Sequence, residues 1–213
     1  MGCYPVGAVN SRNEFAQRIR KPMSLLELVT RARSYRQFYE NEAVSLETLR
    51  QLVELVRLSS SGGNVQPLKF YLSRDPSQNA KIFPTLTFAG QLKDWSGPAE
   101  GERPAAYIVI LGDKRLKPGF GFVDQAIAAH TILLGATEKG LGGVIIGAVK
   151  REQLSMVLDL PEHLEVLLVV PLGKPKSVIH LEPLPADGNT KYSLTENVHF
   201  HVPKRSLDEL LTL

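Results

Sequence analysis

The sequence contains only one cysteine, Cys3, and only one tryptophan, Trp95, among 213 residues. A single cysteine excludes disulfides within the chain and zinc sites built on cysteines, and it favours a reducing, cytoplasmic setting. No apolar run approaches the roughly 20 residues that a membrane-spanning helix needs, so we expect no membrane partner. Blocks of five or six like charges are also missing and the net charge is only +3, so the composition does not favour nucleic-acid binding.

Motifs for hydrolysis, dinucleotide binding and metal binding are missing as well. The sequence holds no Gly-x-Ser-x-Gly elbow, so nucleophilic hydrolysis has little support. Segment 140–147, "GLGGVIIG", lacks the preceding strand and the third glycine of the Rossmann fingerprint, and we interpret it as a tight helix-to-strand turn. His180, His199 and His201 lack partner ligands at short spacing, so we expect no metal site.

Residues 1–22 differ from the rest of the chain. They contain four basic residues and no apolar stretch long enough for a secretory signal. Val6 stands where a myristoylation motif needs Ser or Thr, so that motif is not met. We interpret 1–22 as an N-terminal extension ahead of one domain, 23–213; an arm that packs on a neighbour and an organelle-targeting peptide are the alternatives.

The first predicted helix begins after Ser24, because "SLLE" places Glu27 three residues beyond Ser24 as a capping box. Apolar residues one helical turn apart then form a single stripe: Leu25, Leu28, Val29 and Ala32. This stripe predicts that Ala32 faces the core. A second helix follows Ser45 and ends at the serine- and glycine-rich segment "SSSGGN".

The remaining pattern alternates strands with helices. "LKFYLS" (68–73) reads as a half-buried strand, and the continuous apolar run "YIVIL" (107–111) as a strand covered on both faces. The helix 124–138 carries no charge between its ends, which predicts burial in the chain or by a partner subunit. Further elements are two strands, "GGVII" and "EVLLVVPLG", a helix at 152–158, the strand "HFHV" (199–202) and a short closing helix, "SLDELL". Pattern alone therefore suggests an α/β fold.

Three segments carry groups that can bind an anion or a heterocycle. In "RARSYRQF", Arg33 and Arg36 offer fork-shaped donors suited to phosphate and Ser34 adds a hydroxyl. In "SSSGGNVQP", the amides of Asn64 and Gln66 suit a planar heterocycle. "PKRSLDEL" places two basic residues beside a helix start. Taken singly, each segment is equally typical of a solvated helix end, an ordinary loop or a basic tail.

The order of these segments is more specific than any one of them. "RSYRQF", "SSSGGNVQPLKF", "VDQAIAAHTILLGATEKGLGGVIIG", "VLLVVPLGKP" and "PKRSLDEL" together resemble the successive motifs of the FMN-dependent nitroreductase family. The resemblance covers residues 23 to 213. It implies an α+β, nitroreductase-like fold with a mostly antiparallel central sheet flanked by helices, in place of α/β. It also implies a homodimer with an exchanged C-terminal strand, for which "HFHV" is our candidate.

The resemblance implies an FMN site at the dimer interface. Arg33, Ser34 and Arg36 would bind the phosphate and ribityl chain and approach the pyrimidine side of the flavin. The backbone around Ile146 and Gly147 would face flavin N5 and O4. The remaining cofactor-binding residues are the phosphate ligands Lys204 and Arg205 and, from the partner chain, Ser60, Ser61, Gly62, Asn64 and Gln66.

The sequence departs from the family pattern at three positions. Ala32 stands where the family often has a basic residue, and Arg31 is a candidate substitute. Ser60 replaces the usual proline and Leu68 the usual tryptophan. These departures affect single contacts within the expected site.

The implied activity is hydride transfer from NADH or NADPH through FMN to a small-molecule acceptor such as a nitroaromatic or a quinone, in a ping-pong cycle. The flavin carries the chemistry, so we expect no catalytic side chain, and Arg36 would place positive charge where negative charge develops. The alternatives are another reaction on the same scaffold, reductive dehalogenation or flavin breakdown, and a flavin-binding redox sensor or storage protein. A nucleic-acid-binding module ranks last.

Overall fold

The computed structural model describes residues 23–116 and 121–212, so the predicted extension 1–22 lies outside the described residues. The helices and strands, in chain order, are α1 (Leu25–Arg31), β1 (Phe38–Tyr39), α2 (Leu46–Arg57), η2 (Gly62–Asn64), β2 (Leu68–Ser73), α3 (Pro76–Ile82), η3 (Phe83–Thr85), β3 (Ala106–Asp113), α4 (Gly121–Glu138), β4 (Gly142–Gly143), α5 (Arg151–Val157), β5 (Leu164–Pro175), β6 (Val178–Pro183), β7 (Ser193–Thr195), β8 (His199–Lys204) and η4 (Asp208–Leu210).

The central sheet has the strand order β1-β5-β3-β2, with β4 added to β5. All of these pairings are antiparallel, with Phe70 opposite Ile110 and Ile108 opposite Val170. The α+β fold implied by the resemblance is therefore confirmed, and the α/β reading of the pattern is wrong. The alternation of helices and strands misleads because α3 returns the chain to the neighbouring antiparallel strand and makes no parallel crossover.

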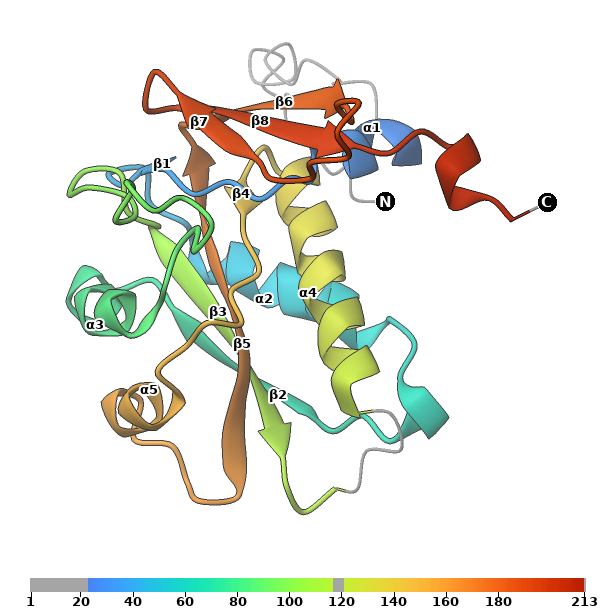
Figure 1. Cartoon of the computed structure of the whole chain (residues 1–213). Helices are drawn as coiled ribbons and strands as arrows, with labels where there is room; N and C mark the ends of the chain where they lie inside the picture. The colour runs from blue at the N-terminus through green and yellow to red at the C-terminus, as the bar shows by residue number, and fades with distance from the viewer. Residues whose placement is uncertain (1–22, 117–120, 213) are drawn as a thin grey trace, which may run out of the picture.

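Two helical layers cover the central sheet, α2 and α4 on one face and α3 and α5 on the other (Figure 1). β3 alternates between the two cores, with Ile108 and Ile110 in the α2/α4 layer and Val109 in the α3/α5 layer. Every residue of β3 is buried, which confirms the expectation for "YIVIL". Strand side chains point to opposite faces in turn, so a strand covered on both sides must be apolar throughout.

The predicted apolar helix, α4, has one face covered within the described part of the chain. Ala128, Ile132 and Ala136 are fully buried in the α2/α4 core, whereas Phe122 is 74% exposed at the start of the helix. Gly135 permits the close approach to α2, because a Cβ there would overlap the side chains of Leu52 and Leu55. The apolar sequence of α4 thus supports one buried face, and it leaves the large apolar side chain of Phe122 exposed.

The capping box of α1 is confirmed: the Glu27 backbone donates to Ser24 Oγ and the Ser24 backbone donates to Glu27 Oε2. Ala32 is buried, as predicted, but the rest of the expected stripe is not, since Leu25 is 70% exposed and no residue within α1 is buried. α1 is one short helix at the end of α4 (Figure 1). Within the described part of the chain, this contact leaves Leu25, Leu26 and Val29 of α1 exposed.

Residues 178–204 form a second, separate sheet with the order β6-β8-β7. β8, which contains the predicted strand "HFHV", pairs with β6 in parallel and with β7 in antiparallel orientation. Both edges of this strand are thus occupied by its own chain, and an exchange of 199–202 with a partner would break these ladders. The closing "SLDELL" is a single 3-10 turn, held by hydrogen bonds between Ser206 and Glu209.

Candidate functional site

The segment that follows α1 carries Arg33, Ser34 and Arg36. Arg33 turns back onto the helix, where its Nε donates to the Ala32 carbonyl at 2.9 Å and its Nη2 to the Val29 carbonyl at 2.8 Å. These carbonyls have no partner inside the helix, so a guanidinium at this end stabilises it. Two of the five N–H donors of Arg33 are engaged in this way, which leaves three for other acceptors.

Arg36 is partly buried and lies against aromatic residues of the C-terminal segment. Its Cζ atom lies 4.5 Å from the ring centroid of Tyr192 and 5.3 Å from that of Phe200. Its Nη1 donates to the Ser34 carbonyl at 3.1 Å. Burial lowers the pKa of Arg36, and the neighbouring Tyr192 partly offsets this effect. Among residues 23–116 and 121–212, no carboxylate lies within ion-pair distance of Arg36.

The turn "GLGGVIIG" lies beside this segment. Gly143 bridges to Ser34 on one side and pairs with Leu172 of β5 on the other. A Cβ on Gly143 would lie 2.7 Å from the Pro171 carbonyl oxygen, so only glycine fits here without a shift of the backbone. The turn reading is confirmed, with Gly140 at φ +72°.

The chain then runs along β5 through the predicted Ile146 and Gly147. Ile146 is buried and bridges to Val169, while Gly147 is exposed and its carbonyl accepts from Arg151 Nη2 at 3.2 Å. The structure therefore brings Ser34, Ile146 and Gly147 to one side of β5.

The predicted serine and amide loop is organised by a residue that the sequence interpretation missed, Asp124. Ser61 Oγ donates to Asp124 Oδ2 and the Gly62 backbone donates to Asp124 Oδ1, both at 2.8 Å. Asp124 is buried near the start of α4, where a negative charge also complements the helix dipole. The sequence signal was available, since Asp124 is the one charge that begins an otherwise apolar helix.

The amides of this loop are exposed. Asn64 and Gln66 adopt positive φ values of 55° and 53°, and the Gln66 backbone donates to Ser61 Oγ at 2.9 Å. Such φ values cost free energy in residues other than glycine and persist only where the surroundings enforce them. Ser60, Asn64 and Gln66 therefore present polar groups outward from a strained, well-anchored loop.

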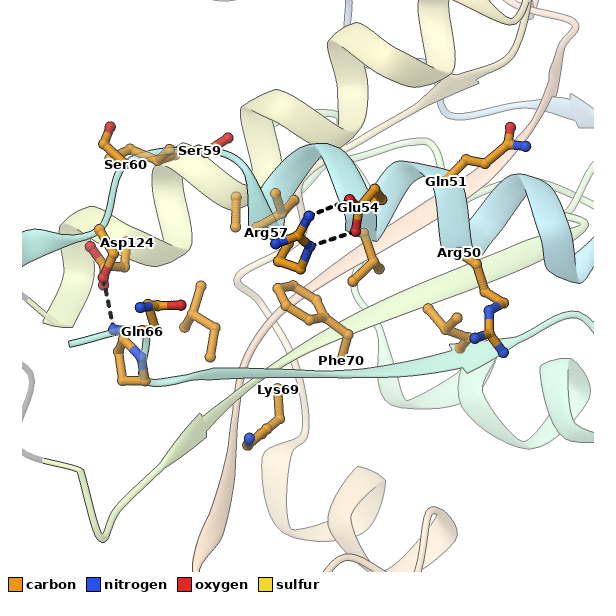
Figure 2. A pocket seen from close by; sticks show the side chains of 18 of the residues that line it. Arg50, Gln51, Glu54, Arg57, Ser59, Ser60, Gln66, Lys69, Phe70 and Asp124 are labelled. Atoms are coloured by element: carbon orange, nitrogen blue, oxygen red, sulfur yellow. Dashed lines mark hydrogen bonds and ion pairs between the residues drawn. The ribbon is translucent and has the colours of Figure 1, made fainter. Parts of the chain in front are cut away.

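A groove of about 860 Å³ runs from this loop along α2 and β2 (Figure 2). Ser60, Ser61 and Gln66 lie at one end, and Phe70 lies between the helix and the strand. The ion pair of Arg57 with Glu54, at 2.6 Å, lines the α2 side. None of Arg33, Ser34 and Arg36 lines this groove.

The two predicted halves of the site lie at opposite ends of α4. The serine loop is bound to Asp124 at the start of the helix, whereas Ser34 is bridged to Gly143, just beyond the end of the helix. A helix of 18 residues is about 27 Å long. One chain therefore cannot bring both halves to the same small molecule.

Lys204 is the last residue of β8 and Arg205 follows it, and both are exposed. Arg205 pairs with Glu209 at 3.3 Å, an exposed ion pair of small energetic value. Within the described part of the chain, neither residue makes a hydrogen bond to Arg33, Ser34 or Arg36. Their predicted role in the phosphate site stays a prediction.

Three histidines come together on the outer face of the C-terminal sheet. His180 Nε2 lies 2.9 Å from His199 Nδ1, and the ring centroids of His180 and His201 are 4.9 Å apart. Over residues 23–116 and 121–212, no group of three or more His, Cys, Asp or Glu side chains is arranged to hold a metal ion. No helix in the same residues is long and apolar enough to span a membrane.

Solved structures with this arrangement of sheet and helices include members of the nitroreductase family. One is a structure from Bacteroides thetaiotaomicron named "Putative NADH dehydrogenase/NAD(P)H nitroreductase". It matches with a TM-score of 0.59 and 25% identity over 72% of this chain and 87% of the other. An FMN-dependent nitroreductase from Clostridium difficile has the same fold, with a TM-score of 0.60 and 21% identity over 72% of this chain and 89% of the other.

Sequence comparison gives the family. The model of the nitroreductase family matches residues 29–174, so the chain belongs to this family of flavin-dependent oxidoreductases. A relative from Archaeoglobus fulgidus, named "Putative NADH dehydrogenase/NAD(P)H nitroreductase", is 31% identical over 71% of this chain and 85% of its own length. An iodotyrosine deiodinase from Thermotoga neapolitana is 24% identical over 71% of this chain and 88% of its own length.

The residues of the segment after α1 fit the anionic part of a flavin nucleotide. A guanidinium that is taken out of water costs free energy unless a negative group compensates its charge. Arg36 is partly withdrawn from water, and it has no carboxylate partner among the described residues. Arg33 and the exposed Ser34 add further donors beside it. This donor set is typical of sites for phosphate and other anions.

Proposed function

We propose that the chain is an NAD(P)H-dependent FMN oxidoreductase that reduces a small oxidised acceptor, such as a nitroaromatic or a quinone, in a ping-pong cycle. The observation that carries this proposal is the partly buried Arg36 guanidinium, which has no carboxylate partner among the described residues and lies next to Arg33 and Ser34. Bound FMN would supply the hydride chemistry at its N5 atom. The names of the Archaeoglobus and Bacteroides relatives support the use of a nicotinamide reductant.

The side chains have binding and positioning roles in this proposal. Arg33 and Ser34 hold the phosphate and ribityl chain, with Lys204 and Arg205 as further phosphate ligands. Arg36 lies at the pyrimidine side, where a fixed positive charge stabilises negative charge that develops on reduction. The backbone at Ile146 and Gly147 approaches the N5 side, where the exposed Gly147 leaves room. No side chain acts as a nucleophile or a general base.

We further propose that the active form is a homodimer with FMN at the interface. The loop of Ser60, Ser61, Gly62, Asn64 and Gln66 would serve the site of the partner chain, because α4 separates it from Arg36 in its own chain. The exposed apolar residues support such an interface: Leu25, Leu26, Phe122, Leu207 and Leu210. An exposed apolar surface of this kind is typical of a face that another chain covers.

For the exchanged segment of this dimer we propose the tail that follows Lys204 instead of "HFHV", because both edges of that strand pair within its own chain. β2 is the edge of the central sheet and has a free side for pairing. Beside it, the groove along α2 has apolar walls that include Leu68, Phe70 and Val56. The tail carries the exposed leucines Leu207, Leu210 and Leu211, and apolar side chains of this kind suit an apolar groove beside a sheet edge. In this proposal residues 23–213 form a single domain and 1–22 an extension. The scarcity of cysteine favours a cytoplasmic location.

Purification and spectroscopy test the proposal. The protein should be yellow, lose its flavin absorption when NADH or NADPH is added, and regain it with a nitroaromatic or a quinone. Sedimentation of the same sample should give the mass of a dimer. Colour without bleaching would favour the sensor or storage alternative, and a monomer that binds FMN would contradict the dimer.

Arg36→Ala tests the residue that carries the proposal. Removal of this guanidinium should lower FMN affinity and slow flavin reduction, because positive charge at the pyrimidine side is lost. Arg74→Ala removes an exposed arginine that follows β2 and is the matched control. Equal flavin content and equal reduction rate in Arg36→Ala and wild type would overturn the assignment.

The deiodinase relative favours one second candidate, reductive dehalogenation on the same scaffold. In that reaction the carbon–iodine bond breaks, and two electrons from the reductant and one proton replace iodide with hydrogen. Release of iodide from iodotyrosine by the protein and NAD(P)H would support this candidate. Turnover of quinones or nitroaromatics without iodide release would exclude it.

A further inference from the structure

Arg36 is enclosed by two aromatic rings. The guanidinium lies 4.5 Å from the Tyr192 centroid and 5.3 Å from the Phe200 centroid, both within the range of a cation–π contact. The two rings are 6.4 Å apart and inclined at 48°, so they form a corner around the cation. Their contact with Arg36 therefore restricts its direction on two sides.

Both rings come from the C-terminal segment 178–204, beyond the part of the chain that the family model matches. Phe200 is fully buried in β8, and Tyr192 immediately precedes β7. Trp95, from the loop before β3, packs edge-on against Phe200, with ring centroids 5.9 Å apart. The family match ends at residue 174. An arginine of the family-matched region is thus held by residues outside that region.

Aromatic rings hold a cation in a different way from a carboxylate. A carboxylate would neutralise the charge of Arg36 and occupy its N–H donors. The face of a ring attracts the guanidinium but leaves its net charge uncompensated, and the surrounding apolar surface strengthens its attraction for an anion. Arginine also carries much rotamer freedom, which the corner removes before any ligand binds.

We propose that Tyr192 and Phe200 are positioning residues, which hold the Arg36 guanidinium at the pyrimidine side of the flavin with its charge available. This inference rests on the proposed function and deepens it. It assigns to the C-terminal sheet a direct influence on the flavin site. Tyr192 and Phe200 act through Arg36 and need not touch the flavin.

Variants that remove one ring test the proposal. Tyr192→Leu and Phe200→Leu should each weaken FMN binding about five- to thirtyfold, the range expected for one partly buried cation–π contact. The midpoint potential of the bound flavin should become more negative, because Arg36 no longer holds its charge close to the ring. Tyr192→Phe keeps the ring and should restore both the affinity and the potential.

Tyr39→Leu is the control, since Tyr39 is an exposed tyrosine of β1 outside the corner. If Phe200→Leu does not fold, Tyr192→Leu alone tests the proposal, because Tyr192 is only partly buried and its replacement should be tolerated. Unchanged FMN affinity and potential in Tyr192→Leu, with a wild-type protein that binds FMN, would overturn the positioning role alone. A wild-type protein that binds no FMN would overturn the proposed function as well.

Discussion

The central sheet and the C-terminal sheet are stabilised differently. β3 is buried along its whole length, between two helical layers. In the strands of the C-terminal sheet, Phe200 is the single buried residue, and the outer face carries His180, His199 and His201. Burial of apolar area is therefore spread over many residues in the first sheet and concentrated on one in the second.

The C-terminal sheet depends on a few polar contacts at its junction with the domain. The Gln37 backbone donates to Ser177 Oγ at 3.1 Å in a buried setting, and Lys176 Nζ pairs with Glu102 at 2.7 Å. Gln37 Nε2 also donates to Glu102, at 2.8 Å. We therefore expect that substitutions in the central core destabilise the whole chain. Substitutions at the junction should instead favour local unfolding of the C-terminal sheet.

The largest expected effect is in the central core. Ile132→Ala removes a fully buried side chain of α4 and should reduce the free energy of unfolding by about 2–5 kcal/mol, because a cavity remains. Urea denaturation measures this change. Met156→Ala, at a side chain of α5 that is 75% exposed, is the control and should change little. Equal stability losses in the two variants would contradict the assignment of the core.

A smaller and more local effect is expected at the junction. Ser177→Ala leaves the buried backbone N–H of Gln37 without its acceptor, at a cost of about 1–3 kcal/mol. Hydrogen exchange and limited proteolysis should increase in residues 178–204 more than in the central sheet. Ser193→Ala, at an exposed serine in the same sheet, is the control. A uniform increase over the whole chain would show that the two sheets unfold together.

The smallest effect is electrostatic and depends on pH. Hydrogen bonds from Lys176 first, and from Gln37, lower the pKa of Glu102 below its usual range. A carboxylate with a lowered folded pKa stabilises the fold above its unfolded pKa of about 4.3, and this contribution is lost as the pH falls through the folded pKa. The C-terminal sheet should therefore open more easily in acid.

Glu102→Gln should remove this pH dependence and reduce protection of the C-terminal sheet slightly at neutral pH. Proteolysis rates at a series of pH values measure both effects, and Glu100→Gln, at an exposed neighbour, serves as the control. The effect should shrink in high salt, since Lys176 is partly exposed and its pair is screened. An identical pH profile for Glu102→Gln and wild type would contradict this role of the junction.

Local sequence patterns predicted most helices and strands correctly. The capping box at Ser24 and the apolar run of β3 depend on neighbouring residues, and both appear as expected. The α/β reading was wrong because strand direction depends on pairing between distant segments, such as β3 with β5. The stripe of α1 predicted burial of Leu25, which requires a covering surface that the described chain does not provide.

The proposed members of the candidate site come from the order of motifs in the sequence, whereas their arrangement comes from the tertiary structure. Motif order assigned Arg33, Ser34 and Arg36 to one group and the loop of Ser61 and Gln66 to another, because residue chemistry and order are properties of the sequence. Tertiary structure decided that α4 separates these groups, that Asp124 anchors the loop and that Tyr192 and Phe200 enclose Arg36. Those contacts join residues far apart in the chain, and packing, which no local pattern encodes, selects them.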